Sequence, residues 1–211
     1  AALMLPALAR AKDKAGQIAC VGQLRQVGWA MRSFANDHRD RFPAHVPPRE
    51  GGANTRPYAW EHFLTLSNEL IPRLLICPAD RLRRPARDFS AQPGGFAHPT
   101  NQNRALSYFV GTHAYSLQSQ TLLAGDRNLT NGIGRLGRCG PANISFGAMP
   151  FDPNPAALAR VGWGAYPHRF AGNICLADGR VIQPRPESLR RQLVRGAPGG
   201  DPGNVNHVLP P

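Results

Sequence analysis

Residues 1–40 read AALMLPALARAKDKAGQIACVGQLRQVGWAMRSFANDHRD and decide the fold. Within this stretch, apolar side chains recur at intervals of four, three, four and three, at Cys20, Leu24, Val27, Met31 and Phe34. At about 100° per residue, side chains so spaced share one face of an α-helix. The sequence therefore predicts a long helix over residues 1–40, whose later half packs on a hydrophobic core.

The first nine residues have a different character, because they are apolar throughout and contain Pro6. As a helix they would rise about 14 Å, whereas a membrane span needs about 20 residues. We interpret residues 1–9 as the downstream remnant of a longer apolar helix in a membrane or a filament. The alternative is the frayed, partly buried start of an ordinary domain.

The composition describes a basic chain that is rich in loops. The 211 residues include 22 glycines and 21 prolines, and the formal net charge is +12. Frequent Gly and Pro favour short strands and long loops over a helical bundle. The positive charge favours polyanionic partners such as nucleic acid, anionic lipid or acidic polysaccharide. No G-x-S-x-G motif occurs, so the sequence gives no support to that class of hydrolase.

After residue 40, short apolar runs alternate with Pro- and Gly-rich loops. We expect a second helix over residues 58–70, strands over 105–110 and 121–124, and a short basic helix over 186–195. Residues 196–211 are again rich in Pro and Gly and are predicted to form a tail. One long helix followed by late antiparallel strands predicts the α+β class.

The clearest local signal is residues 172–183, GNICLADGRVIQ. Two apolar runs flank Asp178-Gly179, a dipeptide typical of two-residue type I′ turns, because such turns need positive φ at both central residues. The sequence therefore predicts a β-hairpin here. The chain divides into a helix over 1–40, an α+β domain over 41–195 and the tail over 196–211.

Four cysteines, Cys20, Cys77, Cys139 and Cys175, are widely spaced, and none lies in a CxxC pair. This spacing disfavours a zinc ribbon or a thioredoxin-type site. An even count in a membrane-tethered chain favours disulfides formed in an oxidising compartment. Of the three possible pairings we favour Cys20–Cys77 with Cys139–Cys175, because the first would tie the long helix to the segment after it. Four buried free thiols are the alternative.

One group of polar residues is a candidate for metal binding or proton transfer. His168, Asp126 and Asp178 could bind a metal or transfer protons, but Asp178 suits a turn and Asp126 suits a strand end, so a structural role is favoured. His168 would then anchor the strand that enters the hairpin, through the backbone or Asp126. His113 and His168 are also the candidate partners of a cysteine.

Residues 81–87 hold four arginines, Arg81, Arg83, Arg84 and Arg87. Such a cluster can bind a polyanion through its positive charge. A solvated loop is the simpler interpretation, and no nucleic-acid-binding fold is indicated by the sequence. DNA or acidic polysaccharide is therefore the alternative partner and not the first prediction.

Several motifs occur in a characteristic order: LPALARAK (5–12), LRQVG (24–28), RFP (41–43), CPAD (77–80), SYFVG (107–111), LAGDRN (123–128), and a histidine separated by nine residues from Asp-Gly. In this order they resemble type IV pilin-like proteins. The closer similarity is to type II secretion G-type pseudopilins of the H-x9-DG group found in Planctomycetes and Verrucomicrobia. The signature residues would be His168, Asp178 and Gly179. The resemblance extends over most of the chain to about residue 182.

The resemblance implies a pilin-like α+β fold, in which a long N-terminal helix packs on a small antiparallel sheet with long Pro/Gly-rich loops. It implies a structural, non-enzymatic subunit of a type II secretion or type IV pilus-like filament, which takes part in protein transport. Its partners would be copies of itself and other pilin-like subunits, contacted through the helix. A segment upstream of Ala1, cut and methylated by a prepilin peptidase, would anchor the chain in the inner membrane. The domain would then face the periplasm or the outside.

The resemblance also raises the question of calcium, because some G-type pseudopilins hold a calcium ion in a late loop. Calcium takes six to eight oxygen ligands. Asp126, Asn128, Asn131 and Asp178 could supply several of them, although no EF-hand spacing is present. We expect no required cofactor, with calcium at these residues as the alternative.

Overall fold

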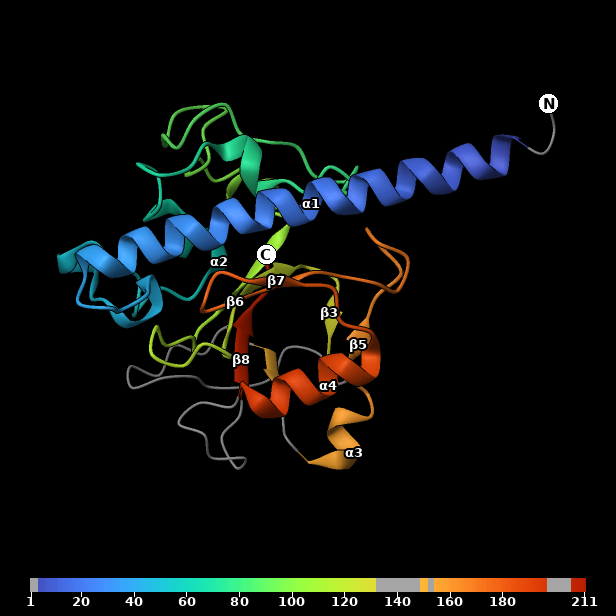
Figure 1. The fold of residues 1–211 in the computed structure, drawn as a ribbon. Coiled ribbons are helices and arrows are strands. Elements are labelled where there is room, and N and C mark those ends of the chain that lie inside the picture. Colours follow the sequence, from blue (N-terminus) through green and yellow to red (C-terminus); the bar gives the residue numbers. More distant parts are fainter. Residues whose placement is uncertain (1–3, 132–148, 152–153, 197–205) are drawn as a thin grey trace.

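The computed structural model describes residues 4–131, 149–151, 154–196 and 206–211, and it has the α+β architecture that the sequence predicts. A single long helix, α1 (Met4–Asp37), lies across an antiparallel sheet (Figure 1). Among the described residues, no helix combines the length and the apolar character that crossing a membrane requires.

The described strands form two sheets. The larger one has the order β4-β8-β1-β2-β6-β7, and every neighbouring pair in it is antiparallel. Its strands are β1 (Tyr108–Gly111), β2 (Leu122–Asp126), β4 (Met149–Phe151), β6 (Ile174–Leu176), β7 (Val181–Ile182) and β8 (Asn206–Leu209). The smaller sheet pairs β3 (Leu129–Thr130) with β5 (Gly162–Trp163).

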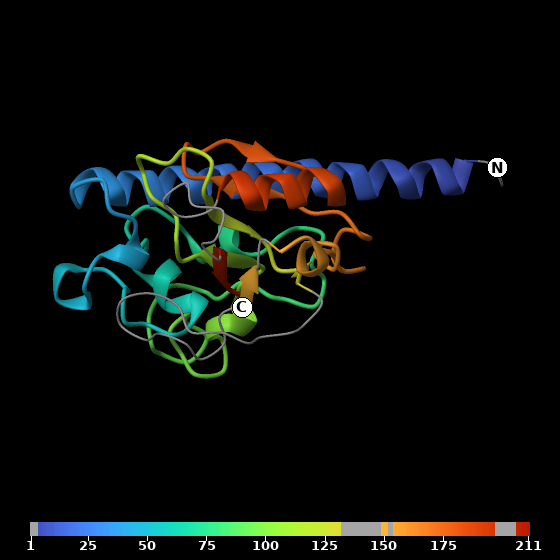
Figure 2. The ribbon, with the colours of Figure 1, turned by 90° about the horizontal axis from the view of Figure 1, so that it is seen from below.

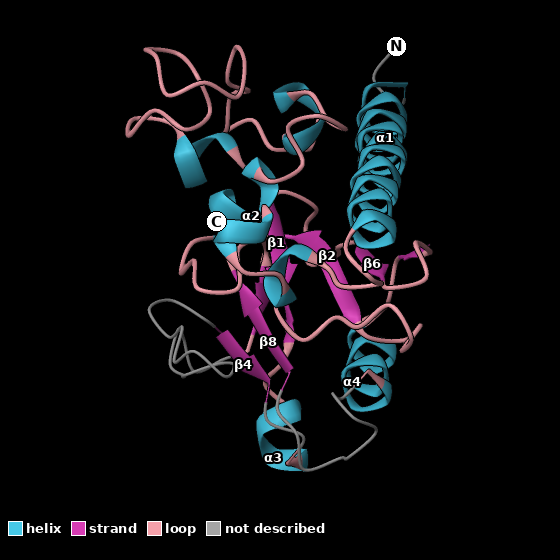
Figure 3. Ribbon diagram, turned by 90° about the vertical axis from the view of Figure 1, so that its left-hand side faces the viewer, coloured by secondary structure: helices cyan, strands magenta, loops and turns pink. Residues whose placement is uncertain are grey.

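Shorter helices complete the fold (Figure 3). They are α2 (Ala59–Leu64), α3 (Pro155–Leu158), α4 (Pro186–Arg195) and the 3₁₀ helices Pro43–His45, Pro48–Glu50, Pro72–Leu75 and Gln102–Ala105. The predicted basic helix over 186–195 is confirmed as α4.

The main sheet is covered on both faces, so its strands alternate between two hydrophobic cores. On β1, Tyr108 and Val110 belong to the core beneath α1, whereas Phe109 belongs to the core beneath α4. On β6, Cys175 faces the first core and Ile174 the second. Successive side chains of a strand point to opposite faces. A strand between two cores therefore needs apolar residues at consecutive positions.

The predicted apolar face of the long helix is confirmed, because Cys20, Leu24, Val27, Met31 and Phe34 are all buried. Gly28 lets α1 approach the hairpin closely, since a Cβ there would lie 2.5 Å from the sulfur of Cys175. Arg32 donates a hydrogen bond of 2.8 Å from its guanidinium to the carbonyl oxygen of Ala177. These contacts fix the later half of α1 on the sheet.

The predicted hairpin is confirmed as β6 and β7, but its turn differs from type I′. Gly179 has φ of 85° and donates to the carbonyl of Leu176, and Asp178 is not among the residues with positive φ. Residues 177–179 thus form a three-residue loop that ends with a left-handed glycine.

Two predicted ranges are wrong in their bounds. The second helix ends at Leu64 instead of residue 70, because the amides of Leu66 and Ser67 bond three residues back and tighten the chain into turns. The first strand starts at Tyr108 instead of residue 105, because Ala105 belongs to the 3₁₀ helix Gln102–Ala105 and the amide of Ser107 bonds to the carbonyl of Leu75 outside the sheet.

The prediction of a tail over residues 196–211 is also wrong for its final part. Asn206–Leu209 form β8, which lies between β4 and β1 inside the main sheet. Val208 and Leu209 are buried there. This pairing joins segments about a hundred residues apart, so no local pattern in the sequence reveals it.

Candidate metal centre

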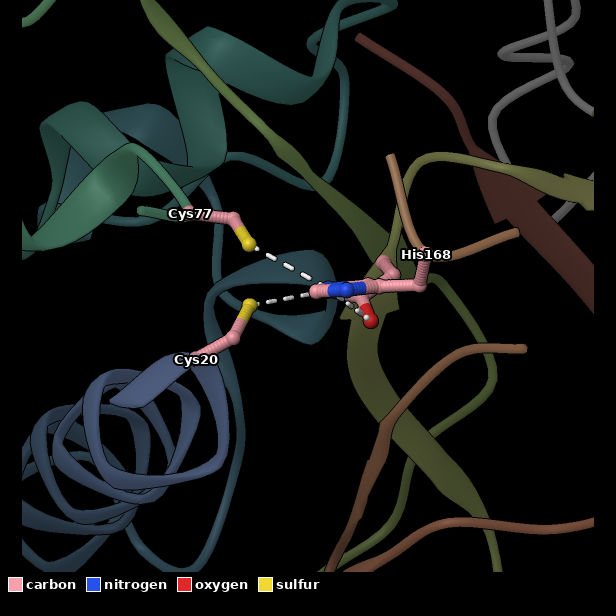
Figure 4. A group of neighbouring side chains, drawn as sticks. Cys20, Cys77 and His168 are labelled. Atoms are coloured by element: carbon pink, nitrogen blue, oxygen red, sulfur yellow. Dashed lines mark hydrogen bonds and ion pairs between the residues drawn. The ribbon is translucent and has the colours of Figure 1, made fainter. Parts of the chain in front are cut away.

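Four side chains from four separate segments meet beneath α1 (Figure 4). Cys20 belongs to α1, Cys77 follows the 3₁₀ helix Pro72–Leu75, Asp126 ends β2, and His168 lies in the loop between β5 and β6. One ligand atom from each lies within 4.8 Å of the other three. We refer to these four residues as the Cys₂AspHis cluster.

Direct contacts connect the four groups in a chain. The Cys20 thiol donates to Asp126 Oδ1 at 3.3 Å, and Asp126 Oδ2 lies 3.3 Å from His168 Nε2. The same His168 nitrogen lies 3.2 Å from the sulfur of Cys77. Two sulfurs, one imidazole nitrogen and one carboxylate are therefore turned toward a common point.

Each cysteine is held by its own local structure. Cys20 lies in the buried stripe of α1, and its sulfur is 3.4 Å from the hydroxyl of Tyr108. Cys77 opens a turn in which the amide of Asp80 donates to the Cys77 carbonyl at 2.8 Å. Helix and turn thus present both sulfurs to the same place.

Asn173 orients the carboxylate of Asp126. Asp126 Oδ2 accepts hydrogen bonds from the backbone amide of Asn173 at 2.8 Å and from its side-chain amide at 2.7 Å. Asn173 is in turn held by the side chain of Gln183, which donates to it at 2.9 Å. The carboxylate is fixed, and its Oδ1 is left facing Cys20.

The cluster is buried, and burial dominates its electrostatics. Burial raises the pKa of Cys20 well above its ordinary value and raises the pKa of Asp126 to about 7. The hydrogen bond with Cys20 lowers the pKa of Cys77 against the opposing effect of burial. Burial lowers the pKa of His168, but the hydrogen bond to Cys77 and the charge of Asp126 outweigh it and raise the pKa.

This arrangement suits metal binding better than catalysis. A nucleophilic cysteine must be reached by its substrate, yet Cys20 and Cys77 are 0% and 1% exposed. Buried Cys, His and Asp side chains that face one point are instead the ligands of closed metal sites. His168 also borders a surface groove of ≈ 790 Å³, which Lys14, Gln17, Arg81 and Tyr166 help to line.

The predicted disulfide Cys20–Cys77 is absent, because both residues are free thiols. The two sulfurs nevertheless lie within 4.8 Å of each other, one on the long helix and one on the segment after the 3₁₀ helix Pro72–Leu75. Cys175 is also a free, buried thiol, whereas Cys139 lies outside the described residues. Burial raises the pKa of Cys175 to about 12.

Of the four residues considered for calcium, Asp178 lies apart from Asp126. Asp126 ends β2, whereas Asp178 lies in the hairpin turn beyond Leu176, which pairs with the first residue of β2. At about 3.3 Å per residue, these two carboxylates are on the order of 13 Å apart. The side-chain amide of Asn128 donates to the carbonyls of Gly164 and Ala171, and Asn131 is buried.

The signature residues have distinct structural places. His168 contacts Asp126, as the sequence analysis allowed, and it also contacts Cys77. Asp178 accepts a hydrogen bond from the amide of Arg180 in the hairpin turn, and Gly179 supplies the positive φ there. The histidine therefore belongs to the cluster and the Asp-Gly pair to the turn.

The four arginines of residues 81–87 have different surroundings. Arg83 donates to the carbonyl of Asn103, and Arg87 pairs with Asp88 at 2.9 Å. Arg81 lines the groove beside His168, and Arg84 is exposed.

Sequence reasoning paired Cys20 with Cys77 and His168 with Asp126, but it missed the assembly of all four at one point. A usable signal was present, since Cys20, Cys77, Asp126 and His168 all stand in or beside the motifs that carry the resemblance. Comparison of the chain with protein-family models, with curated proteins and with solved structures gives no match.

Proposed function

We propose that this chain is a structural, non-enzymatic subunit of a pilin-like filament of the type II secretion or type IV pilus kind. The observation that carries the proposal is the division of α1 into two parts. Its later part packs on the sheet, and its first turns extend past the rest of the molecule (Figures 1 and 2). Residues 4–13 alone span about 15 Å at the helical rise.

The extended part carries apolar side chains in an exposed position. Leu8 is 68% exposed, and Ile18, near the point where the helix meets the body, is 60% exposed. In a filament, neighbouring helices would cover such side chains by close packing. The partners on this proposal are copies of the chain and other pilin-like subunits, and an apolar segment upstream would anchor it in the inner membrane before assembly.

The test is to disrupt the extended helix without altering the body. Leu8→Arg places a charge where a neighbouring helix would pack, whereas Leu117→Arg makes the same change at a 91% exposed position in the body. We expect Leu8→Arg to remove the full-length protein from cross-linked oligomers and sheared filaments in the source cells. Leu117→Arg should leave both unchanged. Equal incorporation of the two variants would contradict the proposal.

A surface module that binds DNA or acidic polysaccharide is the second candidate. It is favoured by the net charge of +12 and by Lys14, Arg81 and Arg169 along one groove. Binding of this kind weakens steeply as salt rises, because each contact releases condensed counterions. Titration of a DNA duplex at two salt concentrations distinguishes the candidates. Affinity that falls with salt and is lost on Arg81→Glu would favour the module.

A further inference from the structure

The geometry points to a zinc site: we propose that Cys20, Cys77, Asp126 and His168 together bind one Zn²⁺ ion and thereby fasten α1 to the body. This inference rests on the Cys₂AspHis cluster and not on the filament proposal. Either one can fail while the other holds.

The donor set selects the metal. Two thiolates, one imidazole and one carboxylate oxygen are all ligands that zinc accepts, and soft sulfur ligands favour zinc over magnesium or calcium. Calcium requires a shell of oxygen atoms, which two sulfurs cannot supply. The cluster is therefore a different site from the calcium residues considered in the sequence.

The spacing of the donors fits tetrahedral coordination. With bonds of about 2.0 to 2.3 Å to zinc, ligand atoms of a tetrahedral site lie about 3.3 to 3.8 Å from one another. Cys77 Sγ–His168 Nε2 is 3.2 Å, and Asp126 lies 3.3 Å from Cys20 Sγ through Oδ1 and 3.3 Å from His168 Nε2 through Oδ2. All four donors lie within 4.8 Å of one another. Small movements outward from these positions would admit the ion.

A cation would also offset the cost of burying the negative charges of the cluster. Three of its four members become negative when deprotonated, and all four are buried. An isolated negative charge in such a place is costly unless it is paired or coordinates a metal. Zinc would displace the protons of both thiols, and the two thiolates, the carboxylate and the ion would then carry a combined charge of only −1.

Surrounding groups already orient the ligands. Asn173 holds the carboxylate of Asp126 with two hydrogen bonds. The hydroxyl of Tyr108 lies beside the sulfur of Cys20. Such second-shell partners are a regular feature of metal sites, because they fix ligand direction.

The role we infer for the ion is structural. All four positions of a tetrahedron are taken by protein, whereas a catalytic zinc keeps one open for water or substrate. The ligands come from α1, from the segment after the 3₁₀ helix Pro72–Leu75, from β2 and from the β5–β6 loop. One ion would therefore join four segments that lie far apart along the chain. The groove at His168 gives a route to the site.

The test uses the whole chain, purified under reducing conditions with Zn²⁺ and then dialysed. We expect one zinc per chain by elemental analysis. Replacement with Co²⁺ should give a thiolate-to-metal charge-transfer absorption and the intense visible bands of a tetrahedral site. A chelator should lower the melting temperature, because an ion bound only by the folded state stabilises it.

Variants locate the site. Cys77→Ser and His168→Ala should each weaken zinc binding by more than about 100-fold, since even second-shell changes typically cost about 10- to 100-fold. Cys175→Ser is the matched control, because Cys175 is a buried free thiol outside the cluster, and it should bind zinc like the wild type. Circular dichroism establishes which variants remain folded.

Two outcomes would overturn the proposal even if every ligand variant unfolds. The first is reduced, folded wild-type protein that takes up no zinc and gives no cobalt–thiolate absorption. The second is a native mass lower by two hydrogens, with Cys20 and Cys77 found in one disulfide-linked peptide, since the sulfurs would then be joined to each other and not to a metal.

Discussion

Two buried carboxylates near His168, Asp80 and Asp126, are treated differently by the fold. Asp80 accepts hydrogen bonds from the guanidinium of Arg127 at 2.6 and 3.2 Å and from the hydroxyl of Ser107 at 2.9 Å. Asp126 is bonded instead by the neutral amides of Asn173 and faces a thiol and an imidazole. Asp80 thus has a permanent cation beside it, whereas the positive partner of Asp126 depends on protonation.

The difference shows that a buried carboxylate can either be neutralised by a cation of the protein or be left for a ligand to neutralise. An arginine–carboxylate pair with two hydrogen bonds is complete within the protein. A carboxylate grouped with two thiols and a histidine is the kind of group that a metal ion completes. The four predictions below test this contrast between Asp80 and Asp126.

The largest effect is expected from breaking the completed pair. Asp80→Ala leaves Arg127, whose side chain is only 20% exposed, without its carboxylate. We expect the free energy of unfolding to fall by about 3 to 5 kcal/mol, as for other buried pairs that lose one partner. Urea titration measures the change. A loss below about 1 kcal/mol would mean that Asp80 and Arg127 behave as a surface pair.

The second effect is a pH dependence that belongs to Asp126 in zinc-free, reduced protein. Its pKa is about 7 in the fold and near 3.8 when unfolded, so between these values the folded state keeps a proton that the unfolded state has lost. The free energy of unfolding of the wild type, relative to that of Asp126→Asn, should therefore be highest below about pH 4. It should decline by up to about 1.4 kcal/mol per pH unit as the pH rises toward 7.

Urea titrations of both proteins at several pH values with chelator present measure this difference. A difference that grows with rising pH would show that Asp126 is charged and well paired without metal. Asp126 would then be paired within the protein, as Asp80 is.

The third prediction concerns the support of the carboxylate. Asn173→Ala removes the side-chain hydrogen bond of 2.7 Å to Asp126 and leaves the backbone one. We expect zinc affinity to fall by about 10- to 100-fold, with one ion per chain still bound at saturation. Competition with a chromophoric chelator measures the affinity. Unchanged affinity would indicate that Asp126 needs no orientation by Asn173.

The smallest effect is expected at an exposed pair, which serves as the reference. Arg41 and Glu50 lie 3.2 Å apart, with side chains 38% and 42% exposed. Because water and salt screen such pairs, Glu50→Ala should lower the free energy of unfolding by no more than about 1 kcal/mol. The same urea assay applies. A loss as large as that of Asp80→Ala would remove burial as the explanation of the contrast.

Several elements could be predicted because their signals are local. The interval of three and four between Cys20 and Phe34 specifies one face of a helix, whatever that face packs against. Asp178-Gly179 between apolar runs specifies a hairpin, although the type I′ turn that the dipeptide predicts is wrong, because Asp178 does not have positive φ. The basic helix at 186–195 follows from Pro186 at its first turn and its apolar spacing.

Other features had no local signal. The Pro/Gly-rich composition predicts a tail where β8 forms, because the partners of β8 in the sheet lie far away in the chain. The pair Cys20–Cys77 was expected as a disulfide, and sequence spacing could not show that Asp126 and His168 would join the two sulfurs. Proximity of this kind depends on how the sheet, the loops and α1 pack together.

By itself, then, the sequence determined the long helix, its buried face, the hairpin and the α+β class, since periodicity and turn chemistry act over a few residues. Only the tertiary structure decided that β8 enters the sheet and that two thiols, a carboxylate and an imidazole meet beneath α1. The physical reason is that these contacts join residues about 40 to 150 positions apart. They form only when two hydrophobic cores close on opposite faces of one sheet.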